Sequence, residues 1–251
     1  MWELSAAQLV SVLLILFAGA LLQSAIGFAA GSFGIPLMLL AGLSLPEAVG
    51  VSQLHSVMHC SVGAYTLRKD IVYRDLALPL VLRLAFLPVG LTAMFYVSAI
   101  DQDYVKQIVG GILLVILALL CGLRAQPRES VPLKWTLTAF IVSGFLGGFC
   151  GMGGVFMAVW VMAHDWEARR ARGFMMFTFL ATLLPQSIAI LLVFPKAAGA
   201  YLLGLAALPI ALLGVLLGLS IGNRLPRDGL RRIVYVVLLL IAVRSIVQPF
   251  L

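Results

Sequence analysis

Apolar runs long enough to cross a lipid bilayer follow one another along this chain, and the first of them contains no charged residue. A membrane-spanning helix needs about 20 consecutive apolar residues. The runs lie at 6–43, 47–67, 75–98, 104–123, 135–163, 173–194, 200–222 and 230–248. Charged residues make up 11% of the chain, against about a quarter in soluble domains. The chain is therefore predicted to be an all-α integral membrane protein with about eight to ten membrane helices, forming a single membrane domain.

The basic residues are placed as membrane topology requires, so the net charge of +7 does not indicate a nucleic-acid partner. Most of them lie in four short clusters between the apolar runs: Arg68, Lys69 and Arg74; Arg124, Arg128 and Lys134; Arg169, Arg170 and Arg172; and Arg224, Arg227, Arg231 and Arg232. Lys and Arg mark the cytoplasmic loops of membrane proteins. We therefore predict a multi-pass protein of the cell (inner) membrane with both termini outside. Because no basic residue precedes Arg68, no cleavable signal peptide is expected.

The basic clusters also predict two halves of opposite orientation, 1–125 and 126–251. The run at 135–163 lies between two cytoplasmic clusters, so it must enter the membrane and return, as a re-entrant hairpin or as two crossings. By the same reasoning, the first run leaves from the outside and returns to it. Weak sequence matches support a duplication, among them DYVKQIVGGILL at 103–114 with DGLRRIVYVVLL at 228–239. Inverted repeats are common in secondary transporters, whose binding sites lie near the midplane where broken helices meet.

Two glycine-rich stretches interrupt runs that would otherwise be continuous helices: GFAAGSFGIP at 27–36 and GFLGGFCGMGG at 144–154. Within a helix, glycine costs about 1 kcal/mol and proline about 3 kcal/mol relative to alanine. A helix that stops inside the membrane leaves N–H groups unpaired, and these must line protein or a wet cavity. Helix N-termini attract anions, and glycine lets backbone amides approach a ligand closely. The amides near 32–35 and 150–155 are therefore predicted to cradle an anion; the alternative is that the glycines serve close helix packing.

The glycine patterns resemble those of a known family. Gly27-Phe28 with Gly31 and Gly34, and G-x-x-G-G-x-x-G-x-G-G at 144–154, are similar to the paired signatures of the sulfite exporter TauE/SafE family, also called the toluene sulfonate uptake permease family. After its last glycine the first pattern continues with Ile-Pro, where the family has further glycines. The resemblance covers nearly the whole chain. It implies a permease that moves small sulfur-containing anions such as sulfite or organosulfonates, usually outward. No cofactor is expected.

Polar side chains inside membrane segments are costly and usually face the protein interior or a transport pathway. We therefore combine the glycines of the two breaks with the polar residues of the neighbouring runs as candidate substrate-binding residues. The candidates are Gly31, Ser32, Gly34, Gly148, Cys150, Gly151, Gly153, Gly154, Gln23, Ser24, Ser52, Gln53, Ser56, His59, Thr182, Gln186 and Ser187. Hydrogen bonding between helices is the alternative role for each polar side chain.

Three charged or titratable side chains inside the runs have several possible roles. His55 and His59 lie on one helix face and suit coupling to a proton gradient. They are not expected to bind a metal, because serine stands where the HExxH motif has glutamate. Arg83 could attract the anion, pair with a carboxylate or extend to the inner surface. Since no carboxylate lies centrally in a run, a sodium ion would depend on backbone carbonyls.

The sequence therefore favours a secondary transporter for a small anion that works by alternating access. An anion channel with the same helix-end site is the alternative. An intramembrane enzyme is disfavoured, because no nucleophile–base pair or metal set is present. The expected partners are the anion and the lipid bilayer, with a coupling proton or sodium ion and a homo-oligomeric state left open.

Overall fold

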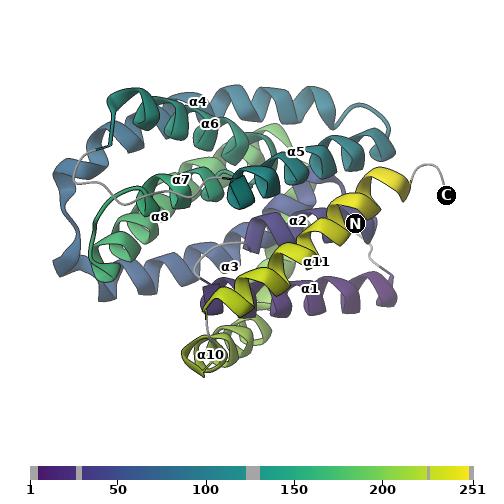
Figure 1. Cartoon of the computed structure of the whole chain (residues 1–251). Helices are drawn as coiled ribbons and strands as arrows, with labels where there is room; N and C mark the ends of the chain where they lie inside the picture. The colour runs from purple at the N-terminus through teal and green to yellow at the C-terminus, as the bar shows by residue number, and fades with distance from the viewer. Residues whose placement is uncertain (1–4, 27–29, 123–130, 225–226, 249–251) are drawn as a thin grey trace.

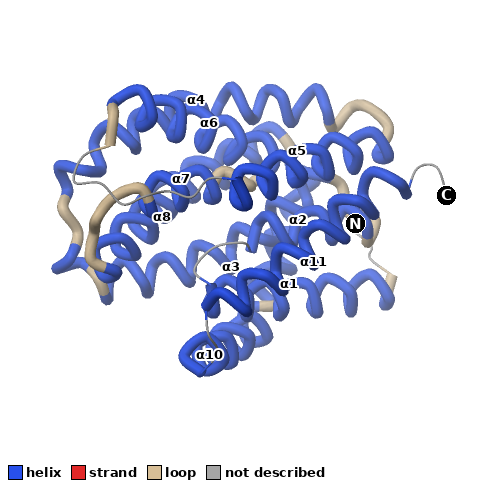
Figure 2. Tube along the Cα trace, in the orientation of Figure 1, coloured by secondary structure: helices blue, strands red, loops and turns tan. Residues whose placement is uncertain are grey.

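The computed structural model describes residues 5–26, 30–122, 131–224 and 227–248, and these residues form helices and short links without a strand (Figure 2). The helices are α1 (Ala6–Ile26), α2 (Ala30–Leu40), α3 (Leu45–Thr66), α4 (Tyr73–Val97), α5 (Gln102–Gly122), α6 (Leu133–Cys150), α7 (Gly154–Met162), α8 (Ala168–Val193), α9 (Ala198–Ala206), α10 (Leu208–Arg224) and α11 (Arg227–Val247). Short 3₁₀ turns lie at Arg68–Asp70 (η1) and Pro195–Ala197 (η2). The predicted all-helical class is confirmed.

Five described helices are long and apolar enough to cross a membrane, and a sixth span results if the bent pair α9–α10 is counted as one. The multi-pass membrane character is thus confirmed, whereas the count of about eight to ten membrane helices stays a prediction. The second interrupted run is divided within its glycine stretch, between α6 and α7, and the described parts of the first run are α1 and α2. Residues 27–29 of the first stretch lie outside the described part of the chain.

The run at 200–222 was expected to be one helix, and this expectation is wrong. The structure divides it into α9 and α10, which meet at an angle of 52°. The break falls at Ala207, two residues before Pro209. Proline lacks the N–H that would continue the helix, and its ring crowds the carbonyl of the preceding turn. The proline therefore sits in the first turn of α10, where neither defect matters.

Four close pairs of helices join the N-terminal half of the chain to the C-terminal half. α4 packs along α6 and α1 along α10, while α3 packs on α8 and α5 on α11. Figure 1 shows the α4–α6 pair and the α1–α10 pair on opposite sides of the bundle. The short helix α2 contacts α1, α3, α5 and α11, and α7 contacts α6 and α8. The short helices α2 and α7, which follow the two glycine stretches, are therefore enclosed by longer helices.

Glycines permit the closest of these contacts. A Cβ at Gly144 would lie 2.7 Å from the Arg83 carbonyl oxygen, and one at Gly148 would collide with the Leu87 carbonyl oxygen. Between α1 and α10, a Cβ at Gly214 would lie 2.5 Å from the Phe17 carbonyl oxygen. Small residues let membrane helices approach in this way. Part of the 144–154 motif thus serves helix packing.

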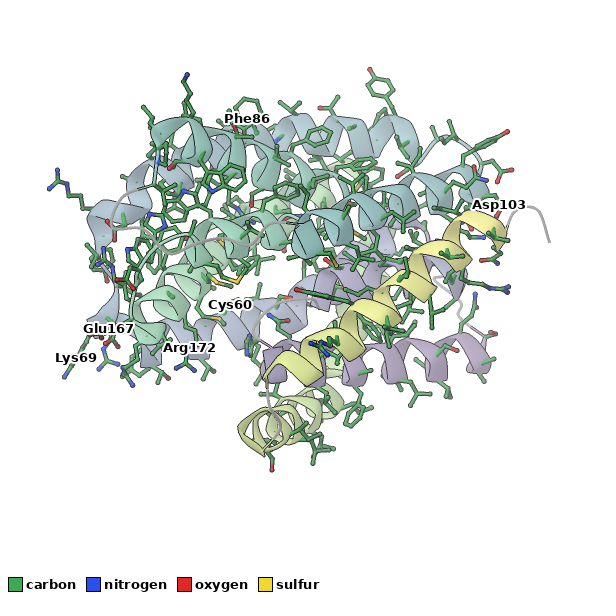
Figure 3. The ribbon with its side chains drawn as sticks, viewed as in Figure 1. Cys60, Lys69, Phe86, Asp103, Glu167 and Arg172 are labelled. Carbon is green, nitrogen blue, oxygen red and sulfur yellow. The ribbon has the colours of Figure 1, made fainter. Side chains whose placement is uncertain are left out.

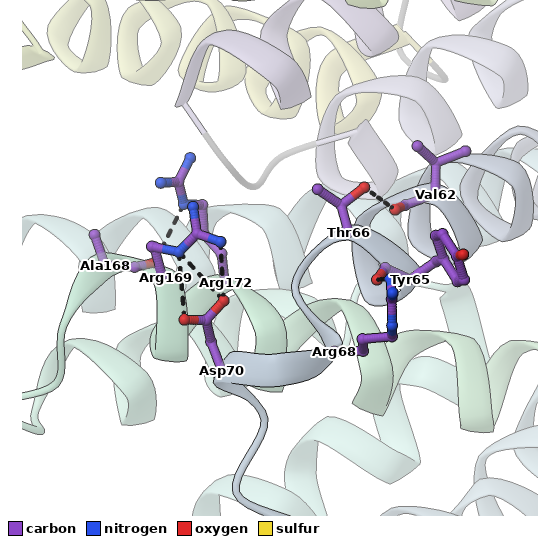
Figure 4. A network of polar contacts seen from close by, with 8 residues as sticks. All are labelled: Val62, Tyr65, Thr66, Arg68, Asp70, Ala168, Arg169 and Arg172. Atoms are coloured by element: carbon purple, nitrogen blue, oxygen red, sulfur yellow. Dashed lines mark hydrogen bonds and ion pairs between the residues drawn. The ribbon is translucent and has the colours of Figure 1, made fainter.

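Basic and acidic links lie at opposite ends of the bundle. Figure 3 places Lys69 and Arg172 at one end and Asp103 at the other. At the basic end, Arg169 Nη2 lies 3.1 Å from Asp70 Oδ2 (Figure 4), and Arg170 Nη2 lies 2.6 Å from Asp75 Oδ2. The structure thus brings two of the basic clusters together, as a shared membrane side requires. The assignment of that side to the cytoplasm stays a prediction.

Candidate functional site

A cavity of about 70 Å³ lies where the two glycine breaks meet. In the same measure a water molecule needs roughly 10–15 Å³, so the cavity has room for several waters or a small anion. It is bordered by α1, α2, α3, α4, α8 and the α6–α7 link. The predicted residues that line it are Gln23, Gly31, Ser32, Ser52, Gln53, Ser56, Arg83, Gly151, Gly153, Gly154 and Gln186.

The two glycine breaks lie directly against each other at this cavity. A Cβ at Gly31, in the first turn of α2, would lie 2.7 Å from the Gly151 carbonyl oxygen. A Cβ at Gly151 would lie 2.7 Å from Ile35 Cδ1. Gly151 has a φ of 68°, a left-handed conformation that favours glycine, and its N–H donates to the Gly147 carbonyl as α6 ends. Each break therefore depends on the absence of a side chain in the other.

The N-terminal turn of α7 forms one wall of the cavity. The helix begins at Gly154 with Gly153 as its N-cap, and no side chain caps it. Gly153, Gly154 and Val155 all line the cavity. The first N–H groups of a helix have no acceptor within the helix and carry a partial positive charge. Gly31 and Ser32, in the first described turn of α2, also line the cavity.

Arg83 places a positive charge in the cavity wall. The residue lies on α4 and is 3% exposed, so its side chain does not extend to the membrane surface. Its Nη1 donates to Ser143 Oγ at 3.1 Å, and its Cζ lies 5.2 Å from the centre of the Phe179 ring. Among the described residues no carboxylate lies within ion-pairing distance of it. A buried charge is costly without a partner of opposite charge, so the site is suited to an anion.

Amide side chains complete the polar lining. Gln53 Oε1 accepts hydrogen bonds from Ser187 Oγ at 2.7 Å and from the Tyr201 hydroxyl at 2.6 Å. Gln53 lines the cavity, and its Nε2 has no acceptor among the described residues, so one N–H donor of this side chain is left for a ligand. Gln186 Nε2 donates to the Gly147 carbonyl at 2.6 Å, which ties α8 to the glycine stretch of α6.

Some predicted site residues lie outside the cavity. Gly34 borders a smaller hollow between α1, α2 and Ser52, and Gly148 packs on α4. Cys150 is buried with Sγ 3.6 Å from the Leu146 carbonyl oxygen, and the Thr182 hydroxyl donates to the Thr178 carbonyl.

The remaining predicted residues support the site or lie apart from it. Ser187 contacts Gln53, as described above, and Ser24 has a buried hydroxyl at the end of α1. His59 borders an apolar groove between α3 and α10. The side chain of His55 lies outside the described part of the structure. A role of His55 in proton coupling therefore stays a prediction, and His59 is not among the residues that line the cavity.

Sequence reasoning missed several residues that shape the site. Ser143 donates through Oγ to the Gly153 carbonyl at 2.7 Å and accepts from Arg83, so it links α4, α6 and the second break. Ser143 could have been identified from the sequence, because it is a polar residue inside an apolar run. Phe179 and Cys60 line the cavity, and Tyr201 holds Gln53. These three carry no signal in the sequence, because only the packing of distant helices brings them to the site.

A multi-pass helical protein with a polar cavity between broken helices has the architecture of a membrane transporter. The sequence family described as "Sulfite exporter TauE/SafE" matches residues 11–245. Because the match covers nearly the whole chain, the chain belongs to the TauE/SafE family of sulfite exporters. No curated protein and no solved structure matches the chain significantly.

Proposed function

We propose that this chain carries a small sulfur-containing anion, such as sulfite or an organosulfonate, across the membrane through the cavity at the two glycine breaks. One observation carries the proposal: in a member of a sulfite exporter family, Arg83 lines a cavity between the helices without a described carboxylate partner. An anion in that space would supply the missing counter-charge. Its oxygens would accept hydrogen bonds from Gln53 and from the first N–H groups of α7.

We further propose that the halves 1–125 and 126–251 form an inverted repeat. If α1–α5 correspond to α6–α11, with α9 and α10 together as the counterpart of α4, the α4–α6 contact matches the α10–α1 contact. The α3–α8 and α5–α11 pairs then lie on the pseudo-twofold axis. The α3–α9 and α8–α4 contacts form a second matching pair, whereas the contacts of α2 with α5 and α11 have no counterpart among the main contacts of α7. Such repeats support alternating access, in which the halves move about a fixed central site.

The test is transport by the purified full chain in proteoliposomes. Labelled sulfite or methanesulfonate should enter saturably, and unlabelled anion inside the vesicles should accelerate uptake by counterflow. Protein-free liposomes and uptake of labelled choline provide the controls. Large single-channel currents would contradict a carrier and favour a channel. Absence of flux for every sulfur oxyanion tested would contradict the proposal itself.

Removing the hydroxyl groups that hold Gln53 should weaken substrate binding without abolishing it. Tyr201→Phe deletes one of the two donors to Oε1, so the amide loses part of its orientation. We expect KM for the anion to rise about three- to tenfold, in line with a neutral hydrogen bond of about 1 kcal/mol, with kcat little changed. Transport kinetics in proteoliposomes measure both constants.

The control for this variant is Thr138→Ala, which removes an exposed hydroxyl that bonds only to the Lys134 carbonyl of its own helix. It should leave both constants unchanged. An unchanged KM in Tyr201→Phe would show that Gln53 does not contact the anion.

A further inference from the structure

We infer that the cavity accepts singly charged oxyanions and rejects doubly charged ones. This inference rests on the proposed function and adds the charge class of its substrate. Its starting point is a count of charges at the site: among the described residues that line the cavity, Arg83 is the only charged one. The other lining groups are backbone, hydroxyl, amide, thiol and apolar side chains.

Among the described residues, no second charged side chain contacts Arg83. Its guanidinium contacts Ser143 on α6, Met157 on α7 and Phe179 on α8. On α3, Cys60 is a thiol at the cavity wall, and His59 borders the separate groove beside Leu208 and Val215.

The closest acidic residue along α4 is Asp75, eight residues from Arg83 and so about 12 Å along the helix. It is already paired with Arg170. Asp70 is likewise paired with Arg169 at the same end of the bundle. These carboxylates are therefore compensated where they lie, and they neither add to nor subtract from the charge in the cavity.

The charge balance decides which anion fits. A monoanion beside the guanidinium makes the buried site neutral. A dianion would leave one negative charge in a space that holds only a few waters, and an unbalanced buried charge is strongly unfavourable. The first N–H groups of α7 add partial positive charge beside the oxygens, but they do not supply a second full counter-charge. The site therefore matches sulfonates, which are monoanions, and the hydrogen sulfite form of sulfite.

This charge class has a measurable consequence in the pH dependence of binding. Sulfite loses its second proton near neutral pH, so its monoanionic fraction falls as the pH rises, whereas methanesulfonate keeps one charge throughout. Thermal unfolding of the purified full chain reports binding, because a ligand of the folded state raises Tm. The probes are methanesulfonate, sulfite and sulfate, each at mildly acidic and mildly alkaline pH.

The expected result is equal stabilisation by methanesulfonate at both pH values and about tenfold weaker apparent binding of sulfite at the alkaline one. Sulfate should bind about 100-fold more weakly than methanesulfonate. Sulfate binding as tight as methanesulfonate would overturn the inference while leaving the proposed function in place. Failure of all three anions to stabilise the protein, together with no flux in proteoliposomes, would overturn both.

A gain of charge tests the same balance in the opposite direction. Ser56→Lys adds a second cation at a half-buried position on the cavity wall, where the native hydroxyl bonds only to its own helix. The ratio of sulfate to methanesulfonate affinity should rise at least about tenfold. Ser56→Met, of similar length and without charge, is the matched control and should not change this ratio. A rise of the same size in Ser56→Met would overturn the inference. If Ser56→Lys does not fold, the wild-type anion series decides alone.

Discussion

Arg83→Gln is expected to lower anion transport about 100-fold or more without lowering the stability of the folded protein. The loss of transport follows because the guanidinium is the charge that balances the bound anion. Stability should hold because the empty protein no longer buries a cation that lacks a described carboxylate. A substitution that removes a purely structural arginine would instead lower Tm. Flux in proteoliposomes and thermal unfolding of the same preparation measure the two effects.

Two further variants sharpen this prediction. Arg83→Lys keeps the charge but loses the planar fork of donors, so transport should fall less, by about tenfold. Arg172→Gln is the control, because this arginine is exposed and its Nε bonds only to the Ala168 carbonyl. Its flux should equal that of the wild type. Wild-type flux in Arg83→Gln would remove the central support for an anion at this cavity.

The membrane class and the two breaks could be predicted because they depend on local composition. Glycines within apolar runs marked the stretch between α1 and α2 and the link between α6 and α7, whereas Pro36 of the first stretch lies inside α2. The division of α9 from α10 was missed, because Pro209 looks no different in sequence from prolines that remain inside helices. Pro79, Pro88 and Pro185 are such cases. Whether a proline breaks a membrane helix depends on the neighbouring helices that satisfy the freed backbone groups.

The cavity residues were predicted in part, for a reason specific to membrane helices. The polar residues Gln53 and Gln186 stood out against apolar runs, and both line the cavity. The sequence does not show which glycines face the cavity. Gly147 lines it, whereas the neighbouring Gly148 packs against the backbone of α4. In a soluble helix the polar face would settle the orientation, but lipid and protein interior are both apolar. The sequence therefore identified the glycine-rich stretch at 144–154 but not which of its residues face the cavity.

Gly31→Ala is expected to reduce transport by about tenfold or more and to destabilise the protein by about 1–3 kcal/mol. Its methyl group would lie 2.7 Å from the Gly151 carbonyl oxygen. That contact is with backbone at a left-handed residue, so relief requires the two breaks to separate. Because both breaks wall the cavity, separation moves the N-terminal turns of α2 and α7 away from a shared anion.

The matched control for this glycine is Gly111→Ala on α5, where a Cβ would meet nothing within 4 Å. It should leave flux unchanged and raise Tm slightly, since alanine stabilises a helix relative to glycine by about 1 kcal/mol.

Gly154→Ala separates the loss of fold from the loss of function. Its methyl group would meet the end of the Phe179 ring, a side chain that can shift, and this ring lies over Arg83. The variant should fold with nearly wild-type stability and still lose transport. Normal flux in both Gly31→Ala and Gly154→Ala would mean that the anion does not pass between the two glycine breaks.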